Sequence, residues 1–318
     1  MITTTTTSSA RPTAHLWRGL LLVCLAGVVW GTIGPAVALI GEGSDLSPLT
    51  MGAYRAIAAV SVLLVACRVT GRLRSSISLA RHQWRRVAAV GVLTAAFQLL
   101  FFVAVLAIGV SVATVVCLGF APVLLLVVTS ARRRRLPSPS QVVTVTTAVV
   151  GLLLVGLVGN GGEQPPDPTL GILAALGSGA AYALSAHTGG PLSRRLDTLT
   201  VTTATMSVAA AVLIPGGFGL AYLRGEAMTT TDVRSWLLLV YLGVVTMAFA
   251  YALLFAGLRS TPSGTAVVAT LVEPVTAVVI AVLLLGEALT PAGVVGSLLI
   301  LAAIATLGRQ VEQEPQPQ

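Results

Sequence analysis

Long apolar segments alternate with short polar ones along almost the whole chain. An α-helix needs about 20 apolar residues to cross the hydrocarbon core of a bilayer. Ten charge-poor segments have about this length, near residues 17–40, 48–68, 87–107, 110–131, 140–159, 169–189, 198–222, 235–258, 261–285 and 291–308. The uncharged stretch 87–131 is too long for one such helix, so we expect two helices there, joined by a tight turn near Gly109. The pattern predicts an all-α membrane protein with ten transmembrane helices.

The second half of the chain repeats the first without a gap, at a separation of 152 residues, the distance from Gly19 to Gly171. This shift also places Gly27 on Gly179, Gly91 on Gly243, Phe97 on Phe249, Ser111 on Ser263, Pro122 on Pro274 and Pro139 on Pro291. Each half carries five predicted helices, and an odd number reverses the direction in which the second half enters the membrane. We therefore expect two inverted five-helix repeats, an arrangement typical of alternating-access transporters.

The repeats also divide the chain into domains. We expect the first repeat to cover residues 17–159 and the second to cover 169–308. The segment between them, 160–168, contains three prolines, which end one helix and make a stiff connection to the next. The polar stretch 1–16 and the acidic, glutamine- and proline-containing stretch 309–318 are typical of disordered tails.

The 19 basic residues are all arginine, and they are distributed unevenly between the two sides of the predicted membrane. One side holds Arg11, Arg18, Arg68, Arg72, Arg74, Arg81, Arg85, Arg86, Arg132–Arg135, Arg194, Arg195, Arg259 and Arg309. The other side holds only Arg224 and Arg234, and Arg55 lies within a helix. Because cytoplasmic loops carry an excess of basic residues, we predict a multi-pass protein of the plasma (inner) membrane with both termini in the cytoplasm.

The composition excludes several classes of protein. The chain is 55% hydrophobic and only 9% charged, whereas soluble domains are about 25% charged. The formal charge of +8 lies in short loops between apolar segments, which argues against a nucleic-acid partner. Cys24, Cys67 and Cys117 all lie inside apolar segments without metal-ligand spacing, so we expect neither a metal site nor a disulfide. Motifs of ATPases and hydrolases are also absent, and we expect a non-enzymatic protein without a cofactor.

Several local motifs together carry a family resemblance. The first predicted helix contains Trp30-Gly31, and the second begins with Pro48 and carries Arg55. The ninth reads Ser263-Gly264-Thr265-Ala266, then Glu273-Pro274-Val275, and is followed by Gly286-Glu287-Ala288-Leu289-Thr290. With these motifs the chain resembles the EamA-type ten-helix branch of the drug/metabolite transporter superfamily over roughly residues 17–308. The resemblance implies an exporter or facilitator of amino acids, other small metabolites or toxic compounds, with a central cavity between the halves.

Glu273 is the most informative candidate residue, because it lies near the middle of an apolar helix. A charged side chain at this depth costs at least about 2.5–3.5 kcal/mol, so we expect it to face the cavity, pair with a donor or carry a proton. It could contact an ammonium group of the solute or couple transport to protons. The alternative is a structural hydrogen bond where Pro274 kinks the helix.

Three further polar side chains are candidates for the same cavity. Arg55 could bind a carboxylate of the solute or pair with Glu273, or its side chain could extend to the lipid headgroups. His187 could titrate near neutral pH, or it could be an interfacial residue at a helix end. Gln98 could add polarity to the cavity or bridge two helices.

Aromatic residues at mid-membrane depth complete the candidate site. They are Trp30, Phe97, Phe101, Tyr182 and Tyr251. Trp30 and Tyr182 are equivalent under the 152-residue shift, which predicts that both face the same central space. Packing in the protein core is the alternative for each of them.

These observations predict a secondary transporter that exports a small organic solute such as an amino acid or a drug-like compound. We expect its two repeats to rock around a midplane cavity. Without a nucleotide site, the energy would come from the gradient of the solute or from coupled protons, and Glu273 is the candidate proton carrier. The expected partners are the solute, protons and membrane lipids. The alternative is a membrane sensor or scaffold that binds a ligand without transporting it.

Overall fold

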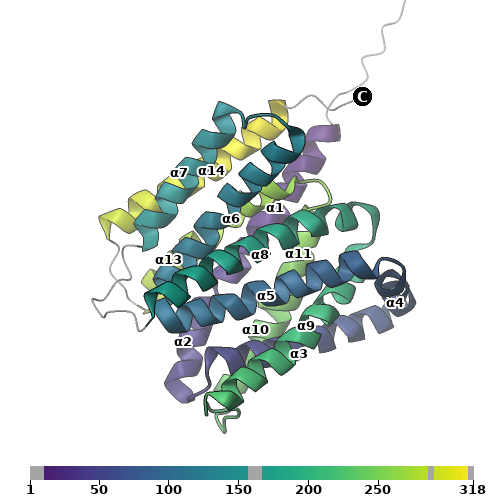
Figure 1. Cartoon of the computed structure of the whole chain (residues 1–318), viewed down its shortest axis with the longest axis vertical. Coiled ribbons are helices and arrows are strands. Elements are labelled where there is room, and N and C mark those ends of the chain that lie inside the picture. Colours follow the sequence, from purple (N-terminus) through teal and green to yellow (C-terminus); the bar gives the residue numbers. More distant parts are fainter. Residues whose placement is uncertain (1–10, 157–166, 286–289, 314–318) are drawn as a thin grey trace, which may run out of the picture.

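The structure, a computed structural model, describes residues 11–156, 167–285 and 290–313 (Figure 1). These residues form helices, and their only β-type pairing is an isolated bridge between Leu46 and Ala227. Nine apolar helical segments in this part of the chain are long enough to cross a membrane, and a tenth, Pro291–Leu307, is slightly shorter. The prediction of an all-α membrane protein with ten transmembrane segments is confirmed.

The first repeat contains α1 (Arg11–Gly31), α2 (Ile33–Gly43), α3 (Pro48–Val69), α4 (Leu73–His82), α5 (Trp84–Ile108), α6 (Val110–Arg133) and α7 (Pro139–Gly156). The second contains α8 (Pro168–Arg195), α9 (Thr198–Leu223), α10 (Val233–Gly243), the π-helix η2 (Val244–Phe249), α11 (Ala250–Gly257), α12 (Ser263–Ala269), α13 (Val272–Leu285) and α14 (Pro291–Gln313). Three membrane segments are composite: α1 with α2, α10 with η2 and α11, and α12 with α13.

The boundaries differ from the expected ones mainly near the termini. Helix α1 begins at Arg11, within the expected N-terminal tail, and α14 continues to Gln313, beyond the expected end of the last helix. Most of the expected linker 160–168 and the motif at 286–289 lie outside the described residues. The turn at Gly109 is confirmed: this glycine has φ of +80° and separates α5 from α6.

The packing of the helices follows the sequence repeat. Helix α5 packs on α8, and the equivalent pair is α11 on α1. Helix α6 packs on α8, and the equivalent contact joins α12 and α13 to α1. In the remaining two pairs, α3–α9 and α7–α14, each helix packs on its own repeat equivalent. Figure 1 shows α7 and α14 side by side. The two-repeat architecture is therefore present in the contacts as well as in the sequence.

Glycine allows the closest of these equivalent contacts. A Cβ atom on Gly179 of α8 would lie 2.4 Å from the carbonyl oxygen of Cys117 in α6. A Cβ atom on Gly27 of α1, the repeat equivalent, would lie 2.9 Å from the carbonyl oxygen of Thr270 at the end of α12. Both distances are too short for any side chain, so these two helix pairs need glycine to pack.

Some helices that are equivalent under the repeat differ in continuity, because one of them is interrupted and the other is not. Pro35 lacks the N–H that would bond the carbonyl of Gly31, and α1 ends at that glycine. In the same way, Pro274 lies four residues after Thr270, where α12 ends. Pro122, the repeat equivalent of Pro274, does not interrupt α6.

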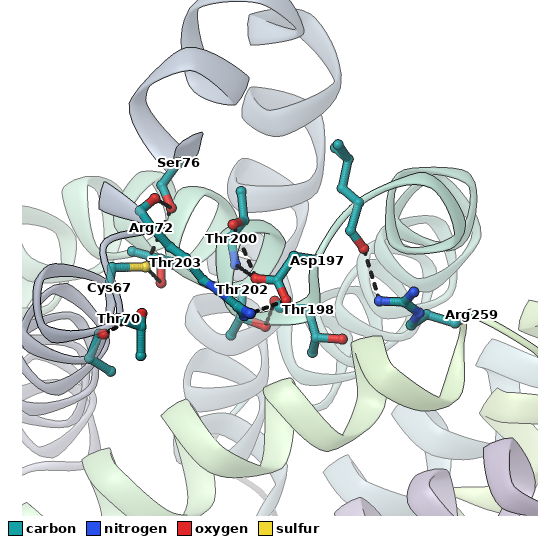
Figure 2. A network of polar contacts seen from close by, with 12 residues as sticks. Cys67, Thr70, Arg72, Ser76, Asp197, Thr198, Thr200, Thr202, Thr203 and Arg259 are labelled. Atoms are coloured by element: carbon teal, nitrogen blue, oxygen red, sulfur yellow. Dashed lines mark hydrogen bonds and ion pairs between the residues drawn. The ribbon is translucent and has the colours of Figure 1, made fainter. Parts of the chain in front are cut away.

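A polar network connects the repeats at one end of the bundle (Figure 2). Arg72, just before α4, forms an ion pair of 2.5 Å with Asp197, whose carboxylate also accepts a hydrogen bond from the backbone N–H of Thr200 at the start of α9. Nearby, the Sγ atom of Cys67 lies 3.1 Å from the Thr203 hydroxyl oxygen. We call the end of the bundle that holds Arg72, Arg132 and Arg194 the arginine-rich end, and the opposite end the arginine-poor end. The network ties α3 and α4 to α9 at the arginine-rich end.

Candidate functional site

A cavity of 540 Å³ lies between the two repeats. Its lining includes the first residues of α3, α6 and α14, which begin at the arginine-poor end. It extends to Trp30, Arg55 and Glu273 near the middle of the bundle. A volume in this range and a lining drawn from both repeats are typical of small-molecule sites.

Most of the cavity wall is apolar, with Phe101, Phe102, Val105 and Val278 among its residues. Arg55 and Glu273 are the only charged residues among the described residues that line it. An apolar wall with two opposite charges can bind a solute that has a hydrophobic body and one or two ionic groups.

Arg55 is held in place by the π-helix of the second repeat. Its Nη2 atom donates a hydrogen bond of 3.3 Å to the hydroxyl oxygen of Thr246, and this hydroxyl donates to the carbonyl of Leu242. The side chain is only 6% exposed, and its Nε atom has no hydrogen-bond partner in the described part of the chain. The guanidinium therefore does not extend to the headgroups, which was the alternative interpretation of this residue, and it lies at the cavity instead.

The same π-helix also changes which residues face the interior. A π turn contains an extra residue relative to an α turn and rotates the side chains that follow it. Phe97 packs inside the protein, but its repeat equivalent Phe249, the last residue of η2, is 54% exposed. Tyr251, two residues later, is buried and only 4% exposed. An ungapped repeat alignment cannot predict this rotation, because it pairs Phe249 with Phe97.

The predicted aromatic residues come together in one layer beside the deep end of the cavity. The ring of Trp30 lies edge-on to those of Tyr182 and Tyr251, with centroid distances of 6.2 and 5.3 Å. Phe97 follows Tyr182 at 5.1 Å, and Phe101 follows Phe97 at 6.4 Å. Trp30 lines the cavity and Tyr182 does not, so the two rings are in contact but only one of them was found at the central space that we predicted for both. We call these five residues the aromatic layer.

Hydrogen bonds anchor the aromatic layer to the interrupted helices. Trp30 Nε1 donates to the carbonyl oxygen of Thr246 at 2.9 Å. The hydroxyl groups of Tyr182 and Thr270 lie 2.8 Å apart. The layer is therefore connected to the π-helix and to the break between α12 and α13.

Glu273 lies in the first turn of α13, directly after this break. Its side chain lines the cavity and has no hydrogen bond or ion pair with any other described residue. The N-terminal end of a helix favours a negative charge, which gives a local reason for an acidic residue at this position. Arg55 lines the same cavity, but the described residues contain no ion pair between the two side chains.

The structure does not bring Gln98 and His187 to this cavity. Gln98 is 5% exposed in α5, and neither Oε1 nor Nε2 has a hydrogen-bond partner within the described ranges. His187 lies instead in a second pocket, at the arginine-rich end. The nine predicted residues therefore divide into a group of seven around the cavity and two separate positions.

The second pocket has a volume of 380 Å³ and is lined by parts of α6, α7, α8, α12 and α14. Many of its lining residues are repeat equivalents of residues that line the cavity. These pairs include Pro122 with Pro274, Leu126 with Val278, Thr129 with Ala281, Gln141 with Gly293, Ser263 with Ser111 and Leu307 with Val155. The two openings thus lie at opposite ends of the bundle and are related by the inverted repeat.

No cluster of three or more potential metal ligands occurs in the parts of the chain that the structure describes. Cys67 and Cys117 are buried and Cys24 is partly buried, and all three are free thiols. Buried cysteines of this kind pack as small apolar side chains.

Comparison with known proteins identifies the family. The sequence model of the EamA-like transporter family matches residues 17–157 and, a second time, residues 169–309. The chain belongs to the EamA-like transporter family. Its membership agrees with the two repeats, and the protein is a membrane transporter rather than an enzyme.

Two relatives and one solved structure are similar along nearly their full length. An uncharacterized transporter, YwfM, from Bacillus subtilis is 28% identical over 294 residues, covering 90% of this chain and 92% of that protein. An uncharacterized inner membrane transporter, YicL, from Salmonella typhimurium is 25% identical over 293 residues, covering 90% and 94%. A crystal structure superposes with a TM-score of 0.74 over 93% of this chain and 99% of that chain, at 19% identity, which supports the fold alone.

Proposed function

We propose that this EamA-like protein is a secondary transporter that moves a small organic solute outward across the inner membrane by alternating access. The observation that carries the proposal is the pair of openings at opposite ends, which the 152-residue repeat relates to each other. The aromatic layer lies next to the deep end of the larger cavity. Rocking of the two repeats would exchange which opening is connected to the central residues.

The distribution of arginine supports the orientation. Because cytoplasmic loops are enriched in basic residues, the arginine-rich end belongs in the cytoplasm, together with both termini. The larger cavity then opens outward, and the present structure corresponds to an outward-facing state. In this state the network of Arg72 and Asp197 holds α4 against α9 at the cytoplasmic end.

The cavity favours a solute with an apolar body and opposite charges. Arg55 offers a fixed guanidinium to a carboxylate, and Glu273 offers a carboxylate to an ammonium group. An amino acid or a drug-like zwitterion fits these groups and the apolar wall. We infer that the solute belongs to this chemical class.

Glu273 is the residue that we propose to couple transport to protons. Glu273 lines the cavity and forms no ion pair or side-chain hydrogen bond with a described residue, so its carboxylate is available to a proton or to a cationic group of the solute. The two would then compete for one site. Entry of protons from outside would release the solute and return the empty protein to the inward-facing state.

Counterflow in proteoliposomes, screened over labelled amino acids and cationic dyes, tests the proposal. Once a solute is found, Glu273→Gln should abolish uptake driven by a pH gradient while solute exchange without a gradient continues. Arg55→Gln should weaken the apparent affinity by roughly 10- to 100-fold, because a hydrogen bond to a charged group contributes about 1.5–3 kcal/mol.

Matched variants outside the cavity control for the loss of charge. Glu226 and Arg224 form an ion pair with each other at the arginine-poor end, and neither lines the cavity. Glu226→Gln and Arg224→Gln should leave affinity and coupling unchanged. If Glu273→Gln keeps the full response to a pH gradient, Glu273 is not the proton carrier, and if no solute exchanges in any form, the transport proposal is wrong.

A further inference from the structure

The pocket at the arginine-rich end has a chemical character that the cavity lacks. It is lined by Arg132 and Arg133 at the end of α6 and by His187 and Arg194 near the end of α8. None of the described residues that line it is acidic. Three guanidinium groups therefore surround one concave space of 380 Å³.

Within the described part of the chain, these guanidinium groups have no carboxylate partner. The ion pairs among the described residues use Arg72, Arg224 and Arg234. Arg132, Arg133 and Arg194 take part in none of them. Like charges that line one pocket repel each other, and a bound anion would reduce the repulsion.

His187 does not add a fourth charge to the pocket. Its Nε2 atom lies 3.3 Å from Nη1 of Arg132. Because arginine can only donate, Nε2 must accept, and the ring is neutral with its proton on Nδ1. This proton points to the hydroxyl oxygen of Ser263 at 3.2 Å, which leaves the hydroxyl hydrogen of Ser263 available to a ligand.

The repeat shows that this polar lining is specific to one end. Thr129 and Gln141 line the pocket, and their equivalents in the cavity are Ala281 and Gly293. His187 is equivalent to Pro35. A preference for arginine in cytoplasmic loops explains basic residues at this end. It does not explain why uncharged hydrogen-bonding groups from two other helices, α7 and α12, line the same space.

We propose that this pocket is a binding site for a phosphate group. Guanidinium groups bind phosphate oxygens with paired hydrogen bonds, and a phosphate monoester carries a charge of about −1.5 to −2 with three acceptor oxygens. The phosphate can come from an anionic phospholipid headgroup or from a soluble phosphorylated compound. The headgroup phosphate is a diester with a single negative charge, but both sources present anionic phosphate oxygens to Arg133, Arg194 and Ser263.

The experiment measures binding to the purified full-length protein in a neutral detergent at low salt. One arm titrates glycerol phosphate, a soluble phosphate monoester, and the other titrates phosphatidylglycerol, with phosphatidylcholine as the neutral reference. Binding is followed by native mass spectrometry and by the increase in the melting temperature. The pocket variant is Arg133→Gln with Arg194→Gln, which keeps the contact between Arg132 and His187.

The matched control is Arg74→Gln with Arg81→Gln, which removes the same charge from exposed positions of α4 at the same end. A charge-preserving variant, Arg133→Lys with Arg194→Lys, separates electrostatic effects from effects on folding. We expect the wild type, the control and the lysine variant to bind, and the pocket variant to bind at least tenfold more weakly.

The two arms identify the source of the phosphate. Binding of glycerol phosphate assigns the pocket to a soluble ligand, and binding of phosphatidylglycerol alone assigns it to lipid. The proposal is overturned if neither compound binds the wild type, or if the pocket variant binds as tightly as the control. Because the transport test uses neither these variants nor these ligands, each proposal can fail without the other.

Discussion

Two groups of three membrane segments are equivalent under the repeat but are built differently. In the first group, α5, α6 and α8 are continuous helices that pack on one another. In the second group the corresponding segments are all interrupted: η2 lies between α10 and α11, α12 is separated from α13, and α1 is separated from α2. We call these the continuous group and the interrupted group.

The candidate site depends mainly on the interrupted group. Thr246 in η2 accepts hydrogen bonds from Arg55 and Trp30, and Glu273 lies in the first turn of α13. Each interruption leaves backbone polar groups that a regular α-helix would bond internally. At membrane depth, irregular backbone of this kind is tolerated only where it is buried in protein or lines a cavity. The comparison indicates that the continuous group is a support and that the interrupted group carries the chemistry.

The largest expected effect concerns the close contact within the interrupted group. A Cβ atom on Gly31 of α1 would lie 2.7 Å from the carbonyl oxygen of Glu273, whereas the repeat equivalent in the continuous group is already an alanine, Ala183. Gly31→Ala should lower the free energy of unfolding by roughly 1–3 kcal/mol through overpacking. The melting temperature of the detergent-solubilised protein measures this effect.

Gly34 in α2 provides the matched control for this substitution. No atom lies within 4 Å of a Cβ placed on Gly34, so Gly34→Ala should leave the melting temperature unchanged or raise it slightly. Equal destabilisation by both substitutions would show that close packing of α1 on α13 at Gly31 is not the cause of the effect.

A smaller effect is expected from the prolines that the repeat places at the same position. Pro274→Ala restores the N–H that can bond the Thr270 carbonyl, which favours an uninterrupted helix by up to about 3 kcal/mol. Part of this energy would oppose the change between the two states. We expect the initial rate of solute counterflow to fall roughly tenfold, or about 1.4 kcal/mol.

Pro122→Ala tests the same substitution in the continuous group. Helix α6 already runs through Pro122 without a break, so the rate of counterflow should change little. Equal losses for the two alanine variants would contradict the assignment of transport movements to the interrupted group.

The smallest effect is expected outside both groups, in the ion pair that ties α4 to α9. The side chains of Arg72 and Asp197 are 47% and 38% exposed, and exposed pairs contribute about 0–1 kcal/mol. Arg72→Gln should therefore lower the melting temperature by at most about 3 °C, with a smaller difference in high salt. Arg74→Gln, which removes a charge without a described ion pair, should have no effect, and a loss above 2 kcal/mol for Arg72→Gln would show that this network is not a surface contact.

The sequence by itself determined the architecture. Apolar length sets the number of spans, because the bilayer has a nearly constant thickness, and the ungapped repeat sets the pairing of helices. The turn at Gly109 was also predictable, because an uncharged stretch of two helix lengths must contain a turn, and glycine readily adopts the backbone angles of a turn. Depth along a helix likewise identified Arg55, Glu273 and the aromatic residues as candidates, since position in a span is a local property.

Only the tertiary structure decided how these candidates are arranged. The direction of a side chain depends on the number of residues in each preceding turn. Because of the π turn of η2, Tyr251 rather than Phe249 points into the protein, and no proline in this segment indicates the irregular turn. The partners of Arg55, and the separation of His187 and Gln98 from the cavity, depend on contacts between helices distant in the chain. Such contacts arise from packing, whereas the pattern of apolar residues records only which segments enter the membrane.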